Sequence, residues 1–199
     1  MRIFIMRARK AVTKPEFDMD HLPKEGKMDT VCAAIANSIW IANDMRRDAV
    51  FHAVLEGPPY GPKVITFRGA EMKGMWHDER SVAGYIKDAL RRGRDLRLNE
   101  EAKVRVGVGV AKKSFERLVW EYAKKGVQLV VLDEKGADIR KFPFAKDSVI
   151  IFGDPVGLPG KVEQFMKQFS ANKVSLGPRI LFSSHCPVIV NNELDRRNL

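Results

Sequence analysis

The carboxyl-terminal third of the chain contains the stretch Val149-Ile-Ile-Phe-Gly-Asp-Pro-Val-Gly-Leu-Pro-Gly160, where a short apolar run ends abruptly in a loop of glycine and proline. A second stretch follows closely, Val174-Ser-Leu-Gly-Pro-Arg-Ile-Leu-Phe-Ser-Ser-His-Cys-Pro-Val-Ile-Val-Asn-Asn-Glu-Leu-Asp195. Each stretch places a sharply turning loop beside a buried strand. In α/β proteins such loops expose backbone amides and carbonyls to a ligand at the ends of strands. The sequence therefore predicts a ligand site at these two loops.

Strand-like and helix-like segments alternate along the whole chain. Apolar runs predict strands at 2–6, 49–55, 64–68, 104–110, 127–132, 149–152, 173–176 and 179–182. Amphipathic spacing predicts helices at 29–48, 81–92, 112–125, 161–169 and 191–197. With 45% hydrophobic residues, the chain can bury a core of its own. We therefore expect one α/β domain, residues 1–199, built around a largely parallel sheet.

The charge of the chain is strongly basic, with 35 Lys and Arg against 25 Asp and Glu and a formal net charge of +10. Nucleic acid is the first candidate partner, because phosphates attract clustered cations; a basic surface without a partner is the alternative. Arg46 with Arg47, and Arg91 with Arg92, are the candidate RNA-binding residues. Among the tryptophans, Trp76 lies in a glycine-flanked loop and is free to stack on a base, whereas Trp40 and Trp120 are expected in the core.

The sequence lacks the motifs that are typical of several other functional classes. No apolar run is long enough to span a bilayer, and two cysteines cannot build a disulfide framework, so a cytoplasmic protein without membrane contact is expected. Gly107-Val-Gly109 is followed by Lys112 where a dinucleotide fingerprint has its third glycine, which favours a closely packed strand. His185 and Cys186, if adjacent on a strand, point to opposite faces and form no nucleophilic pair. No cysteine or histidine spacing predicts a metal site.

The glycine-rich loops carry a resemblance to a known family. Phe152-Gly-Asp-Pro-Val-Gly-Leu-Pro159, Ser175-Leu-Gly-Pro178 and Ser184-His-Cys-Pro-Val-Ile-Val-Asn-Asn-Glu-Leu-Asp195 together resemble the archaeal tRNA pseudouridine N1-methyltransferases of the SPOUT superfamily. The likeness continues upstream through Asp29-Thr-Val-Cys32 and Asp78-Glu-Arg-Ser81 and so covers the whole chain. It implies a deep trefoil knot in about residues 127–199, a homodimer, tRNA as partner, and S-adenosylmethionine (SAM) as methyl donor.

The resemblance also implies where the donor binds. Three loops would enclose it, and apolar side chains would hold the faces of its adenine. The implied cofactor-binding residues are Leu132, Gly153, Leu176, Gly177, Pro178, Arg179, Ile180, Leu181 and Cys186.

The implied reaction is methylation of N1 of a pseudouridine in the T-loop of tRNA, at position 54. This nitrogen carries a proton that must be lost, and much of the rate can come from in-line placement of donor and acceptor. Asp29 and Asp78 are the candidate proton acceptors, with Arg80 balancing charge on the base; the alternative is a helix cap for Asp29 and an ion pair between Asp78 and Arg80. Two other functions stay open. One is a ribosomal RNA pseudouridine N1-methyltransferase and assembly factor, and the other is a non-catalytic basic RNA-binding protein.

Overall fold

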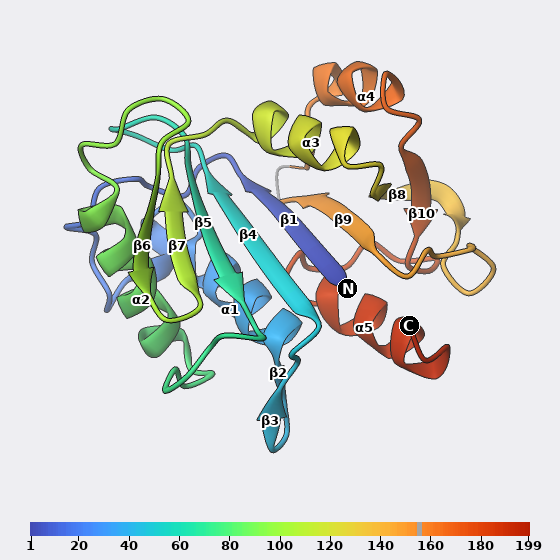
Figure 1. Ribbon diagram of the computed structural model, residues 1–199, viewed down its shortest axis with the longest axis horizontal. Coiled ribbons are helices and arrows are strands. Elements are labelled where there is room, and N and C mark those ends of the chain that lie inside the picture. Colours follow the sequence, from blue (N-terminus) through green and yellow to red (C-terminus); the bar gives the residue numbers. More distant parts are fainter. Residues whose placement is uncertain (155–156) are drawn as a thin grey trace.

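A computed structural model describes residues 1–154 and 157–199, except for the side chain of Glu163. Pro155 and Val156, in the middle of the predicted glycine–proline loop, lie outside the described residues. Those that are described form an eight-stranded sheet and a separate two-stranded ribbon (Figure 1). From one edge to the other, the sheet contains β10 (Asn172–Ser175), β8 (Gln128–Asp138), β9 (Ser148–Gly153), β1 (Arg2–Ala8), β4 (Ala49–Leu55), β5 (Lys63–Arg68), β7 (Val108–Ala111) and β6 (Glu101–Arg105).

The sheet has a parallel part and an antiparallel part. All pairings from β10 across to β4 are parallel, and β1 lies between β9 and β4. The pairings from β4 through β5 and β7 to β6 are antiparallel. The α/β fold with a mostly parallel sheet that the sequence predicts is therefore confirmed.

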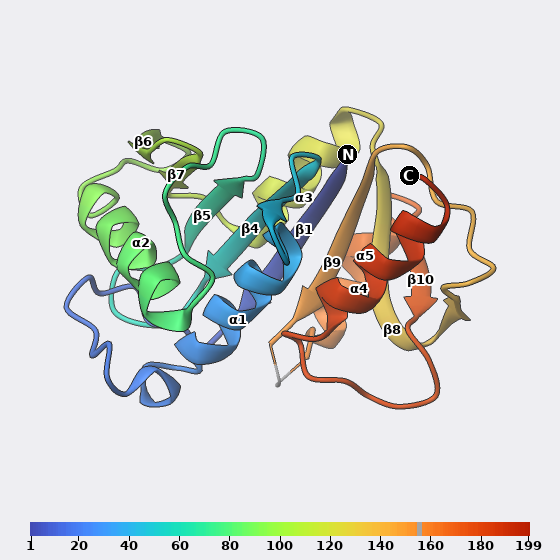
Figure 2. The ribbon, with the colours of Figure 1, turned by 90° about the horizontal axis from the view of Figure 1, so that it is seen from below.

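Helices cover the sheet in two layers (Figures 1 and 2). One layer contains α1 (Met28–Ile39), α2 (Glu79–Arg92) and α5 (Cys186–Arg196), while the other contains α3 (Phe115–Lys124) and α4 (Gly160–Lys167); a short 3-10 helix, η1 (Leu22–Lys24), precedes α1. Successive side chains of β1 point alternately toward the two helix layers. Phe4 and Met6 are buried with the first layer, and Ile3 and Ile5 with the second. Among the described residues, no helix combines the length and apolar character that a bilayer crossing needs.

The predicted helix at 29–48 is wrong in its second half. Helix α1 ends at Ile39, and β2 (Trp40–Ile41) then pairs with β3 (Asp44–Met45) in an antiparallel ribbon. The aromatic Trp40 and β-branched Ile41 favour extended backbone, and the Ala42-Asn43 pair supplies a two-residue turn. Arg46 and Arg47 therefore follow a ribbon rather than ending a helix.

The predicted single strand at 104–110 is also wrong, because the chain reverses at Val106-Gly107 to form the β6–β7 hairpin. Gly107 has φ +78°, and a Cβ there would lie 2.6 Å from a Met72 side-chain atom, so glycine fits this turn for steric reasons. This turn also accounts for the Gly107-Val-Gly109 pattern. The predicted strand at 179–182 is a loop, and the closing helix expected to include 191–197 is α5, which begins at Cys186. Trp120, expected in the core, is 36% exposed on α3.

Candidate functional site

A cleft lies at the carboxyl ends of β8, β9 and β10, which meet at one edge of the sheet. Pairing between β8 and β9 stops at Val131 and Ile151, and the two strands separate beyond that point. The segment 176–185 then runs along this edge from β10 to α5 (Figure 2). The cleft has a volume of about 150 Å³, and two hollows of about 730 and 330 Å³ adjoin it across shared walls. Such a crevice outside the ends of parallel strands is where open α/β sheets bind ligands.

The structure brings together nearly all residues that the sequence implicated in donor binding. The walls of the cleft contain Leu132, Gly153, Leu176, Gly177, Arg179, Ile180, Leu181 and Cys186. Pro178 lines the larger adjoining hollow instead. The two predicted loops, separated by helix α4 in the sequence, therefore form one cleft.

Sequence reasoning missed two acidic residues in the cleft wall, Asp133 and Glu134. Asp133 accepts a hydrogen bond from the Lys135 amide, and its Oδ2 lies 2.8 Å from Lys173 Nζ. The Lys173 hydrogen bond is the main cause that lowers the pKa of the Asp133 carboxyl. Their position was the available signal, because a carboxylate at the end of a parallel strand commonly binds ribose hydroxyls in nucleotide sites.

The backbone of the 176–181 loop is arranged for polar contacts. The amides of Arg179, Ile180 and Leu181 donate no hydrogen bond to any described residue. Gly177 has φ +145°, and a Cβ built on it meets no atom within 4 Å, so its lack of a side chain leaves open space in the cleft. Backbone donors and acceptors beside apolar leucines can hold the edge and the faces of a purine ring.

Cys186 lies in the cleft wall at the start of α5. Its Sγ contacts the Phe182 carbonyl oxygen at 3.6 Å, and burial raises the pKa of the thiol to about 11. The ring of His185 packs edge-on against Phe182, with centroids 5.5 Å apart, and makes no hydrogen bond to the thiol. The two residues are thus at a helix start rather than on a strand, and they form no nucleophilic pair.

The three candidate catalytic residues lie at the starts of α1 and α2, on the same edge of the sheet as the 176–185 segment (Figure 2). Asp78 Oδ1 accepts a hydrogen bond from the Ser81 amide at 2.9 Å and caps α2. Arg80 pairs with Asp20 at 2.5 Å, so the expected Asp78–Arg80 ion pair is not formed. Asp29 lies in the first turn of α1 and does not cap it; its Oδ1 is buried and has no hydrogen-bond partner among the described residues.

The four candidate RNA-binding arginines differ in their freedom. Arg46 is held by Asp195 through two contacts of 2.8 and 2.6 Å, and its side chain is largely buried. Arg47 contacts Asp44 and two backbone carbonyls. Arg91 and Arg92 are exposed on the last turn of α2, where Arg91 lies 3.3 Å from Asp88, so Arg92 is the arginine best placed to meet a polyanion. Within the described parts of the chain, no cluster of three His, Cys, Asp or Glu side chains is suited to a metal.

The chain is similar to known proteins in sequence and in fold. The family model described as "Putative SAM-dependent RNA methyltransferase" matches residues 1–199. Proteins named tRNA (pseudouridine(54)-N(1))-methyltransferase from Methanococcus aeolicus and Methanocella arvoryzae are 36% and 37% identical; the matches cover 98% and 99% of this chain and 98% and 100% of theirs. The crystal structure of Archaeoglobus fulgidus Nep1 bound to S-adenosylhomocysteine superposes with a TM-score of 0.58 at 12% identity, covering 99% of this chain and 97% of that one. That likeness concerns the fold.

Proposed function

The chain belongs to the family of SAM-dependent RNA methyltransferases, and from this premise we propose that it methylates N1 of the pseudouridine at position 54 of tRNA. One observation carries the proposal. The relatives that bear this activity in their names match the chain over nearly its whole length, and the residues implicated in donor binding meet in one cleft. Neither the basic charge nor the fold alone identifies the substrate.

The cleft residues fit the chemistry of SAM. The unpaired amides of 179–181 would receive the adenine edge, and Leu132, Leu176 and Leu181 its faces. Asp133 or Glu134 would accept hydrogen bonds from ribose hydroxyls. Cys186, uncharged at neutral pH, would pack against the sulfur end without repelling or trapping it. When bound, SAM supplies an electrophilic methyl group on a sulfonium.

Among the candidate catalytic residues, the geometry favours Asp29 as the acceptor of the N1 proton. Its Oδ1 receives no hydrogen bond from the described residues, whereas Asp78 already caps α2. Arg80 would have to leave Asp20 before it could balance charge on the base. We expect Asp29→Asn to lower the single-turnover methylation rate at least tenfold, in line with the usual contribution of general bases. Asp78→Asn, which keeps a capping oxygen, is the matched control; equal rates for both variants and the wild type would exclude an acid–base role for either residue.

The arrangement of the carboxyl-terminal region supports the further proposal of one domain with a trefoil knot in about residues 127–199. Segment 176–185 crosses the ends of the parallel strands before α5 packs beside α1 (Figure 2). Arg197 then donates hydrogen bonds to the Ile139 and Phe142 carbonyls in the β8–β9 connection. The last helix is thus fastened to a loop formed much earlier in the chain.

A homodimer is proposed from the exposed apolar side chains around α5. Ile180 and Phe182 are 84% and 70% exposed, and Val188 and Ile189 also reach the surface. These residues lie on and just before one helix, so a second copy could cover them through a two-fold contact. Val188→Asp is expected to shift the mass measured by light scattering from dimer to monomer. A monomeric wild type at micromolar concentration would contradict the proposal.

The test of the proposed function is a methyl-transfer assay with labelled SAM and two tRNA transcripts that differ only in uridine or pseudouridine at position 54. Nucleoside analysis should find N1-methylpseudouridine in the second transcript and no label in the first. A ribosomal RNA fragment containing pseudouridine tests the related alternative, and we expect no transfer to it. Transfer to the uridine transcript, or none to either, would refute the proposal. Because tRNA is modified in the cytoplasm, we expect the protein to act there.

A further inference from the structure

In the described parts of the chain, α3 reaches only the near edge of one face of the antiparallel part of the sheet, where Phe115 and Leu118 pack with Val64 and Ala111. Helices α3 and α4 pack over the face that carries Ile3, Ile5 and Val149, while β5, β7 and β6 extend beyond them (Figure 1). Alternation sends the apolar side chains of these three strands toward α1 and α2. The side chains on the open face include Thr66, Arg68 and Lys103. An exposed sheet face of this composition is polar and positively charged.

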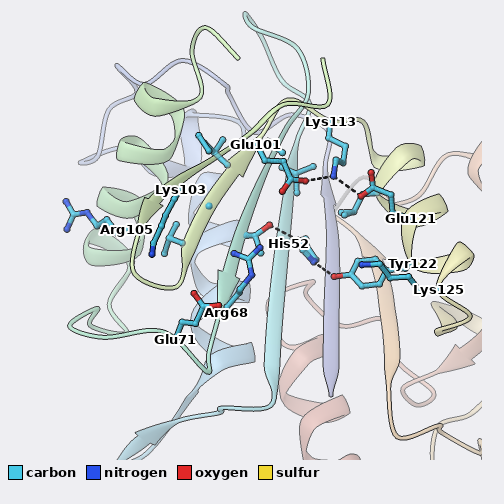
Figure 3. Close-up of a pocket in the computed structure, with 18 residues that line it drawn as sticks. His52, Arg68, Glu71, Glu101, Lys103, Arg105, Lys113, Glu121, Tyr122 and Lys125 are labelled. Carbon is cyan, nitrogen blue, oxygen red and sulfur yellow. Dashed lines mark hydrogen bonds and ion pairs between the residues drawn. The ribbon is translucent and has the colours of Figure 1, made fainter. Parts of the chain in front are cut away.

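A cavity of about 420 Å³ lies between this open face and α3 (Figure 3). Lys113 is at one end, where it forms ion pairs with Glu101 and Glu121 at 2.6 and 2.7 Å. Arg68 and Glu71 are at the other end (Figure 3). The volume falls within the range of ligand pockets, about 300–1,000 Å³, and none of its lining residues belongs to the donor cleft.

The middle of the cavity has a fixed, uncharged floor. The buried His52 ring contacts Thr66 Oγ1 at 2.8 Å and Tyr122 Oη at 2.7 Å, which ties β4, β5 and α3 together. Burial lowers the pKa of His52 to about 3, so the imidazole is neutral at physiological pH. The same network holds the Tyr122 ring, over which Lys125 Nζ lies 5.6 Å from the centroid. Lys125 is thereby kept at the rim.

Three cations of the cavity, Arg68, Lys103 and Lys125, have no carboxylate partner among the described residues. The carboxylates of Glu101 and Glu121 are already held by Lys113, and Arg105 is paired with Asp88. Arg68 is half-buried, and its side chain makes no hydrogen bond or ion pair with any described residue. Beneath it lies Gly109, where a Cβ would be 3.5 Å from Arg68 Nη1. The guanidinium therefore has free donors and lies close over the backbone of Gly109.

We propose that this open face binds the sugar–phosphate backbone of the RNA substrate, with Arg68 receiving one phosphate group in the cavity. A guanidinium whose N–H donors are unpaired can donate two parallel hydrogen bonds to a phosphate, and the surplus of cations attracts a polyanion. Past the edge strand β6, a second hollow shares Lys103 and Arg105 and adds Arg91 and Arg92 of α2, but its walls also contain the acidic residues Asp88, Asp95, Glu100 and Glu101. The inference rests on the proposed function only in taking tRNA as the ligand.

The test measures tRNA binding directly, without SAM, over a range of salt concentrations. Arg68→Ala/Lys125→Ala is expected to weaken binding about tenfold at 0.1 M salt and to lower the slope of log K against log salt by about 1 for each lost contact. The matched control is Lys141→Ala/Lys146→Ala, which removes the same charge from exposed sites outside the cavity. This control should keep wild-type affinity within about twofold, since distant charges are screened.

A steric variant separates the cavity from simple net charge. Gly109→Val fills the floor under Arg68 with a β-branched residue that suits a strand and leaves every charge in place. We expect it to weaken tRNA binding while SAM affinity and the melting temperature stay at wild-type values. Wild-type tRNA affinity and salt slope in both cavity variants would overturn the inference. An effect on the binding of inorganic phosphate without an effect on tRNA would overturn it as well.

The outcome is separable from that of the proposed function. A wild-type protein that binds tRNA but transfers no methyl group would refute the proposed function and leave the cavity assignment to the variants. A wild-type protein that methylates pseudouridine, with cavity variants that bind tRNA equally well, would refute the cavity assignment alone.

Discussion

Asp195 joins three elements near the end of α5, and its replacement by Asn should destabilise the protein measurably. Asp195 Oδ1 lies 2.7 Å from Arg2 Nη2 of β1. Arg46, which follows β3, donates hydrogen bonds to both carboxylate oxygens of Asp195, at 2.8 and 2.6 Å. The two arginine side chains are only 6% and 15% exposed. Hydrogen bonds to charged groups contribute about 1.5–3 kcal/mol each. Because 42% of the Asp195 side chain is exposed, we discount that sum for solvent screening and expect a loss of about 2 kcal/mol.

Urea unfolding followed by circular dichroism measures this loss, and a thermal scan should show a melting temperature lower by about 4–8 °C. The matched control is Asp138→Asn. Asp138 pairs with Arg140 at the same distance, 2.7 Å, but this arginine is 77% exposed, so replacing Asp138 should cost much less stability. A double-mutant cycle with Arg46→Ala should show coupling between Arg46 and Asp195.

The effect of pH follows from the same contacts. The hydrogen bond from Arg46, with a further contribution from Arg2, lowers the pKa of Asp195 in the folded state. Its contribution is therefore complete above the ordinary carboxyl pKa of about 3.9 and is lost as the pH falls through the lowered folded-state pKa. The difference between wild type and Asp195→Asn should be constant from pH 7 to 5 and shrink below about 4. A difference that persists unchanged at pH 3, or one no larger than that of Asp138→Asn, would refute this account.

Three further outcomes are expected. Burial holds the pKa of His52 at about 3, against about 6.5 in the unfolded chain, so the wild type loses stability as the pH falls below 6.5, by up to about 1.4 kcal/mol per pH unit. His52→Gln should flatten this dependence of the unfolding free energy on pH in urea titrations. An unchanged dependence would contradict the prediction. The raised pKa of Cys186, about 11, predicts that iodoacetamide alkylates this thiol slowly at pH 8 and that S-adenosylhomocysteine protects it further. Peptide mass spectrometry measures the alkylation. Labelling as fast as that of a free thiol would contradict the buried position of Cys186. Gly177→Val places a side chain on a backbone with φ +145° and fills the cleft, so calorimetry should show SAM affinity at least tenfold weaker. Gly84→Ala on α2 is the control and should keep the wild-type SAM affinity. Equal affinities of the two variants would remove Gly177 from the site.

The sequence predicted the cleft well because its signals are local. Glycine and proline beside a buried strand constrain the backbone within a few residues, so Gly153 and Gly177 could be assigned to loops at strand ends without knowledge of the fold. The strand at 127–132 was equally clear, because burial on both faces leaves a continuous apolar run.

Other features depend on contacts that are distant in the sequence. The partner of Arg80 is Asp20, sixty residues earlier, and not its neighbour Asp78. The end of α1 at Ile39 was hidden because Ala42 and Met45 continue the helical spacing while the chain turns into a ribbon. The cavity at Arg68 is invisible to periodicity, since its lining residues come from four strands and a helix.

The contact between Arg2 Nη2 and the Leu199 carbonyl, 2.7 Å, joins the first strand of the sheet to the end of the chain as described. During synthesis on the ribosome, β1 emerges almost two hundred residues before this partner. Segment 176–185, which walls the proposed donor cleft, is anchored on its far side by α5, which follows all other described elements in the chain. We therefore expect a nascent chain to acquire SAM affinity only when translation has passed α5, so that SAM can stabilise chains that contain α5 but not shorter nascent chains.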